Sequence, residues 1–163
     1  MAIRQGDKIF PSFWYVKEAE DAARFYASIF PDSKVERVVP LPVDTPSGPA
    51  GSVKVVEFTL FGQPFQAMTA GPHHDFNDAI SFVVTCEDQA ELDRYWNALL
   101  QGGGKEQACG WLNDKFGLRW QIIPRVLGEL MRTDDTTRGR RVAEAMLGMV
   151  KLDIAALKKA YAS

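Results

Sequence analysis

The sequence of 163 residues has little cysteine and histidine, and neither residue type is arranged for metal binding. Its two cysteines, Cys86 and Cys109, lie far apart and belong to no Cys-x-x-Cys pair. Its two histidines, His73 and His74, are adjacent in a Gly-Pro loop, and adjacent side chains of an extended segment point apart. Because the N-terminal segment is polar and shows no signal-peptide pattern, we expect a cytoplasmic protein with reduced thiols.

Long apolar runs, a basic excess and nucleotide-binding glycine motifs are also missing. No apolar stretch approaches the roughly 20 residues of a membrane span, so no membrane association is expected. Lysine and arginine number 19 against 21 acidic residues, which argues against nucleic acid as a partner. The glycines at 102–104 follow a helical pattern, whereas a phosphate-binding loop follows a strand and opens a helix. A Rossmann-type site for a nucleotide or S-adenosylmethionine is therefore not predicted.

The residues that are present have the composition of one soluble globular domain, with 46% hydrophobic and 25% charged residues. Alternating and helical spacings predict where its elements lie. In the first half they predict a strand, a helix and three strands, at 8–16, 17–30, 34–39, 52–61 and 64–70. In the second half they predict a strand, a helix, two strands and a helical tail, at 79–86, 87–100, 110–114, 118–124 and 125–163.

The two halves resemble each other at an offset of 70 residues. This offset aligns residues 24–26 with 94–96, and the strand at 13–16 with the strand at 83–86. The repeat predicts an α+β single domain over residues 1–163, with module one at about 8–75, module two at about 79–124 and a helical tail at 125–163. A small-molecule cleft is expected where the modules meet. The alternative is two unrelated strand–helix units.

Four segments carry a resemblance to a known family. They are FYASIFPDSKV, FNDAISFVVTCEDQAELDRYW, GGGKEQACGWLNDKFGLRWQIIPRVL and AMLGMVKLDIAAL. The chain, from about Lys8 to Leu157, resembles the PhnB-like family, often labelled 3-demethylubiquinone-9 3-methyltransferase, of the glyoxalase/bleomycin-resistance (vicinal-oxygen-chelate) superfamily. The resemblance implies two βαβββ modules forming a curled mixed sheet around a cleft, and a homodimer.

Metal enzymes of that superfamily hold a divalent ion with one side chain from each of four strands. The resemblance places these positions at Pro11, at Gln66 or Met68, at Ser81 and at Gln121. A tight divalent site needs His, Cys or carboxylate ligands, which none of these residues supplies. We therefore predict no metal and no other cofactor.

Strand alternation predicts which side chains line the cleft. It puts Val83 and Thr85 with the metal-related positions, and the ligand-binding candidates are Phe13, Tyr15, Gln66, Met68, Ser81, Arg119 and Gln121. It puts Trp14, Val16, Trp120 and Ile122 on the opposite face, under the helices. Such a lining suits an aromatic or amphipathic small molecule, unless the cleft is filled by its own side chains.

The sequence assigns no catalytic residue, so three functions stay open. The first is a metal-free module that binds a small molecule. The second is a lyase, isomerase or transferase, with or without a metal, acting through Tyr15, Gln121 or a loop histidine. The third is the methyltransferase that the family label names. A nucleophilic cysteine would need a neighbouring base, and the sequence shows none, so we expect Cys86 and Cys109 to be apolar fillers.

Overall fold

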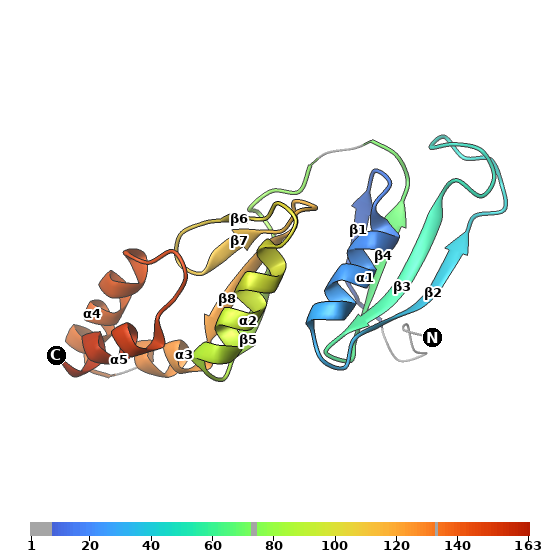
Figure 1. Ribbon diagram of the computed structural model, residues 1–163. Coiled ribbons are helices and arrows are strands. Elements are labelled where there is room, and N and C mark those ends of the chain that lie inside the picture. The colour runs from blue at the N-terminus through green and yellow to red at the C-terminus, as the bar shows by residue number, and fades with distance from the viewer. Residues whose placement is uncertain (1–7, 73–74, 133) are drawn as a thin grey trace. The chain divides into compact units, whose positions relative to one another are not determined.

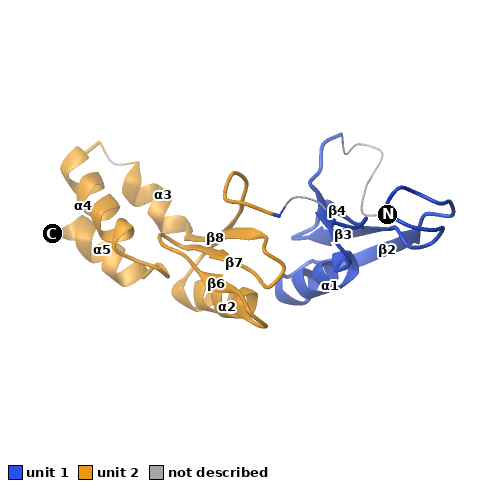
Figure 2. Cartoon of the chain, turned by 90° about the horizontal axis from the view of Figure 1, so that it is seen from above, with its two compact units in different colours: residues 1–75 blue, residues 76–163 orange. Residues whose placement is uncertain are grey.

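A computed structural model describes residues 8–72, 75–132 and 134–163. The chain divides into two compact units, Met1–Asp75 (unit 1) and Phe76–Ser163 (unit 2), which are coloured separately in Figure 2. The predicted α+β class is confirmed: the described residues form two four-stranded mixed sheets and five helices.

Unit 1 is one βαβββ module (Figure 1). Its elements are β1 (Ser12–Tyr15), α1 (Ala19–Ile29), β2 (Lys34–Pro40), β3 (Lys54–Leu60) and β4 (Gln63–Thr69). The strand order is β1-β4-β3-β2, in which β1 runs parallel to β4 and the other pairs are antiparallel. Helix α1 packs on one face of this sheet, where small residues on the helix allow a close approach.

Unit 2 repeats the same order of elements. These are β5 (Phe82–Cys86), α2 (Gln89–Leu100), β6 (Lys105–Glu106), β7 (Trp111–Asn113) and β8 (Arg119–Pro124), with strand order β5-β8-β7-β6. Again the first strand is parallel to the last, and the remaining pairs are antiparallel. Strand β6 was not predicted, because two charged residues at a sheet edge give no alternating pattern.

The C-terminal tail is helical, but it is broken into α3 (Arg125–Met131), α4 (Thr136–Leu147) and α5 (Ile154–Ala162). The connection between α4 and α5 attaches the tail to unit 2. There the backbone N–H groups of Cys109 and Gly110 donate to the carbonyls of Met149 and Val150, both at 2.8 Å. Leu152 is fully buried next to this attachment. No helix in the described ranges is both long and apolar enough to cross a membrane.

Candidate functional site

Each sheet has a face that packs against its own helix and a second face that points away from that helix. We call the second face of each sheet its open face. In unit 1, strand register brings two rows of side chains together on the open face. A polar row crosses all four strands through Ser12, Gln66, Glu57 and Arg37, and an apolar row beside it runs through Trp14, Met68, Val55 and Val39.

The predicted faces of β1 are wrong. Phe13 and Tyr15 are only 6% and 4% exposed and lie on the helix side of the sheet. The hydroxyl of Tyr15 is hydrogen-bonded to that of Tyr26 on α1, at 3.1 Å. Trp14 and Val16, predicted to lie under the helix, are instead 41% and 48% exposed. Phe13 and Tyr15 are therefore core residues and do not line a ligand site on the open face.

The cause of this error is a difference of one residue in loop length. Three residues, 16–18, connect β1 to α1, whereas two residues, 87 and 88, connect β5 to α2. The offset of 70 that aligns the helices is therefore one residue short for the strands. Because side chains alternate along a strand, a slip of one residue moves each of them to the opposite face.

The predicted faces of unit 2 are confirmed by the pattern of burial. Trp120 and Ile122 are buried on the helix side, while Arg119 and Gln121 alternate with them on the open face. Val83 lies opposite Gln121 in the register and is more than half exposed. Trp111, which no pattern had singled out, flanks Gln121 on its other side.

Arg119 does not offer a free charge to a ligand. Its Nε donates to Asp78 Oδ1 at 2.7 Å, and a second guanidinium nitrogen donates to the carbonyl of Gly117. The hydrogen bond from Arg119 holds the pKa of the Asp78 carboxyl below its usual range. The guanidinium is thus bound within unit 2, where it links the segment before β5 to the first residue of β8.

Three of the positions related to metal ligands, Gln66, Ser81 and Gln121, take part in serine–glutamine hydrogen bonds. In unit 1, Ser12 Oγ donates to Gln66 Oε1 at 3.2 Å, and in unit 2, Gln121 Nε2 donates to Ser81 Oγ at 2.8 Å. Pro11 contributes only its backbone carbonyl, which accepts from the N–H of Gln66 at 3.0 Å. These neutral groups do not fit a tight divalent metal site. In the part of the chain that the structure describes, no three His, Cys, Asp or Glu side chains gather as metal ligands either.

The cysteines show no sign of a nucleophilic site. Cys86 is fully buried, and this burial raises the pKa of its thiol to about 12, so the thiolate is scarce near neutral pH. Cys109 is partly exposed and adopts a positive φ of 58° where the tail attaches. His73 and His74 lie outside the described residues.

Two polar side chains on the open faces were missed by the sequence analysis. Glu57 on β3 and Asn113 on β7 each have a buried oxygen, Oε2 and Oδ1, with no hydrogen-bond partner among the described residues. The register places Glu57 beside Gln66, and Asn113 beside Arg119. Glu57 could have been found from the alternation of its strand, because its neighbours Val56 and Phe58 are clear core residues.

The sequence from residue 7 to residue 123 matches the PhnB-like family described as 3-demethylubiquinone-9 3-methyltransferase. The chain belongs to this family. The comparison with curated proteins gave no match. The family match ends before α3 begins, so the helices of the tail lie outside the matched residues.

Solved structures of similar fold support this assignment. The PhnB protein from Bacillus cereus is 30% identical, covering 72% of this chain and 98% of its own, with a TM-score of 0.63. Protein PA1353 from Pseudomonas aeruginosa is 21% identical over 71% of this chain and 96% of its own, with a TM-score of 0.58. The fosfomycin resistance protein FosX from Mesorhizobium loti is 14% identical over 72% of this chain and 90% of its own, with a TM-score of 0.50. The last two show the fold alone.

A hollow of about 560 Å³ lies in unit 2, where α2 of the PhnB-like module meets the tail. Three of the four charged side chains that line it, Asp93, Lys151 and Asp153, already have partners. Lys151 Nζ is 2.7 Å from Asp93 Oδ1, and Asp153 caps α5 by accepting from the N–H of Ala156 at 3.0 Å. The hollow therefore holds the tail in place and carries none of the residues predicted to bind a ligand.

Proposed function

We propose that this PhnB-like protein binds a small aromatic or amphipathic molecule on the open faces of its sheets, without a resident metal. The observation that carries this proposal is the apolar row of unit 1. Met68 lies between Trp14 on one neighbouring strand and Val55 on the other. The indole, the thioether and the branched side chain therefore form one row of apolar surface. Large apolar side chains grouped on an exposed face are typical of ligand or partner sites.

The polar groups next to this row support binding of an amphipathic molecule rather than a purely apolar one. The Ser12–Gln66 pair and Glu57 lie one strand position away from the apolar row, on the same face. In unit 2, the exposed Val83 similarly lies beside the Gln121–Ser81 pair. Neutral hydrogen-bonding groups beside apolar surface can orient a small molecule without attracting a metal ion.

Native mass spectrometry of the protein as purified from cells tests this proposal. We expect protein without metal that carries the mass of an organic small molecule. The same preparation of Trp14→Ala should carry much less of the bound molecule, while Val43→Ala, which removes an exposed apolar side chain from the loop between β2 and β3, should retain it. Stoichiometric Zn, Ni, Mn or Fe would contradict the metal-free proposal. A bound molecule that is unaffected by Trp14→Ala would contradict the proposed site.

We further propose a cytoplasmic homodimer. Exposed apolar residues beyond the family match support dimerisation, because Met131, Leu147 and Val150 would be shielded by a partner copy. The two cysteines form no disulfide with each other, which is consistent with a reducing compartment. Size-exclusion chromatography with light scattering should give twice the mass of the chain, and a monomer at micromolar concentration would contradict the dimer.

The family description favours a second candidate, a methyltransferase. Against it, both sheets are mixed and neither is the doubly wound parallel sheet of a Rossmann-type domain. Calorimetric titration with S-adenosylmethionine separates the candidates, because a methyltransferase must show saturable binding. If the protein turns over some other substrate, loss of that turnover in Gln121→Ala would favour an enzyme over a binding module.

A further inference from the structure

Glu57 places a carboxylate in the middle of the open face of unit 1. Strand β3 is an inner strand of the sheet, and Glu57 is flanked by Gln66 on β4 and by Arg37 on β2. Its Oε2 is buried and accepts no hydrogen bond from any described residue. An acceptor that is removed from water without a donor costs free energy, so such an atom calls for an explanation.

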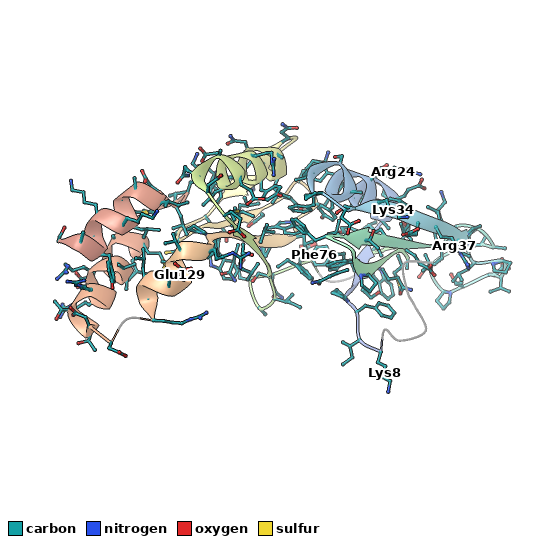
Figure 3. All side chains as sticks on the ribbon, turned by 90° about the horizontal axis from the view of Figure 1, so that it is seen from below. Lys8, Arg24, Lys34, Arg37, Phe76 and Glu129 are labelled. Atoms are coloured by element: carbon teal, nitrogen blue, oxygen red, sulfur yellow. The ribbon has the colours of Figure 1, made fainter. Side chains whose placement is uncertain are left out.

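The neighbouring donors do not satisfy this oxygen. Ser12 Oγ, in the same row, donates to Gln66 Oε1 instead. Arg37, labelled in Figure 3, lies opposite Glu57 in the register, yet the described residues include no ion pair between the two. Lys34 on the same strand as Arg37 pairs with Glu36 at 3.2 Å. The described residues of unit 1 thus supply no donor to this oxygen.

The apolar row lies at a suitable distance from this carboxylate. Val55 and Glu57 are two positions apart on β3, and Met68 and Gln66 are two positions apart on β4. Two positions along a strand span roughly 7 Å, which is about the length of a substituted aromatic ring. A molecule with its apolar body on Trp14, Met68 and Val55 can therefore bring a substituent to Glu57.

We propose that the ligand of this face is an aromatic or similarly apolar amine, and that Glu57 recognises its protonated amino group. This inference rests on the proposed ligand-binding function and adds the charge of the ligand to it. A cation suits the site because Arg37, the neighbour of Glu57 in the register, forms no ion pair with the carboxylate among the described residues. A charge-assisted hydrogen bond to a buried oxygen is stronger than a neutral one, so Glu57 also selects against alcohols and acids of the same shape.

Three probes of one shape test the proposal on the full-length protein: naphthylmethylamine, naphthalenemethanol and naphthoate, each titrated by NMR. We expect the amine to bind at least about tenfold more tightly than the alcohol, and the acid to bind most weakly. In Glu57→Gln the preference for the amine should disappear while the affinity for the alcohol stays within about twofold. The control Glu144→Gln, which makes the same change of charge on α4, should keep the wild-type order.

The outcomes separate this inference from the function on which it rests. If none of the probes binds while native mass spectrometry also finds no organic ligand, the proposed function itself fails. If the probes bind equally, if the acid binds best, or if Glu57→Gln keeps the amine preference, the recognition of an amine is overturned and the binding function stands. Should Glu57→Gln fail to fold, the order of the three probes on the wild type still decides.

Discussion

The two units differ in which element supplies most of the large side chains between the helix and the sheet. In unit 1, three of the four buried residues of α1 are Ala19, Ala22 and Ala23, Tyr26 is its one large buried side chain, and sheet aromatics supply much of the remaining bulk. Phe58 and Phe65 have ring centroids 5.5 Å apart in this layer. In unit 2 the helix supplies the bulk, with the side chains Leu92, Tyr95, Trp96 and Leu99. Because interiors must be densely packed, large residues on one layer require small ones on the other.

This difference explains why the repeat is faint in sequence although it is plain in structure. Equivalent positions such as Ala22 and Leu92 have opposite sizes, so residue identity is not expected there. The open faces differ as well. In unit 1, Glu57 Oε2 has no hydrogen-bond partner among the described residues, whereas in unit 2 the charge of Arg119 is paired with Asp78. The proposed recognition of a charged ligand group is therefore assigned to unit 1.

The largest expected effect comes from exchanging the sizes at these equivalent helix positions. Leu92→Ala should lower the free energy of unfolding by about 2–5 kcal/mol, because it leaves a cavity under α2. Ala22→Leu should lower it by about 1–3 kcal/mol, because α1 lies too close to its sheet for a larger side chain. Urea unfolding measures both, with the exposed Asn97→Ala as a near-neutral control. If Ala22→Leu leaves the free energy of unfolding unchanged, α1 is loosely packed and the proposed difference between the two units is wrong.

The second expected effect concerns the turn before the last strand of each sheet. In unit 1, Phe61 and Gly62 form the turn between β3 and β4 with positive φ angles of 51° and 72°. In unit 2, the Asp114 side chain organises the turn, accepting from the N–H groups of Phe116 and Leu118 and from Trp120 Nε1 at 2.8–3.1 Å. The turn of unit 2 therefore depends on a buried carboxylate, whereas the turn of unit 1 combines two positive φ angles with a hydrogen bond from the N–H of Phe61 to Ser33 Oγ.

Asp114→Ala should accordingly cost about 2–4 kcal/mol of unfolding free energy, because three donors lose one buried acceptor. A shift in tryptophan fluorescence should accompany the loss, since the indole of Trp120 is one of those donors. Asp44→Ala in unit 1 is the matched control, because its carboxylate accepts only from the N–H of Ala50 in an exposed loop. An equal loss in both variants would contradict a special role for Asp114.

Much of this architecture was predictable from the sequence, because most strands and helices have clear periodicity. The faces of β8 follow from Trp120 and Ile122, which alternate with polar neighbours, whereas the family was predicted from the resemblance of four longer segments. The faces of β1 were not predictable, since they depend on a loop that is one residue longer than its counterpart. Candidates Gln66, Met68, Ser81, Arg119 and Gln121 keep their place on or beside the open faces, and their role in binding stays a prediction.

Some features of the structure have local sequence signals, and others depend on contacts between residues that are distant in the sequence. The break between α4 and α5 has local signals, because Gly148 ends α4 and Asp153 caps α5. The burial of Leu152, however, follows from its packing against Gly110, which is distant in the sequence. Likewise, only the strand register shows that Glu57 lies between Gln66 and Arg37.

The C-terminal tail, which unit 1 lacks, is attached to α2 through Gln89. Gln89 donates to Asp93 Oδ1 and to the carbonyl of Leu152, and it accepts from the N–H of Ile154 at 2.9 Å. Gln89→Ala should lower the free energy of unfolding by about 1–2 kcal/mol, because solvent replaces these bonds only in part. Amide hydrogen exchange should become faster in α5 and stay unchanged in unit 1. The control Gln101→Ala should leave exchange in α5 as it is, and equal exchange in the two variants would contradict an anchoring role for Gln89.

The smallest expected effect is that of the ion pair that distinguishes the open face of unit 2. Asp78 is largely exposed, so solvent screens its attraction to Arg119 and Asp78→Asn should lower the Tm only slightly at pH 7. Because the pKa of Asp78 is lowered by the hydrogen bond from Arg119, its contribution is present above the unfolded pKa and is lost as the pH falls through the folded value. The difference in Tm between Asp78→Asn and wild type should therefore vanish at strongly acidic pH and also in 1 M salt. An NMR titration that places the Asp78 carboxyl at or above its usual pKa would show that Arg119 is free in solution. In that case both open faces would offer a charge to a ligand, and the contrast between the units would be lost.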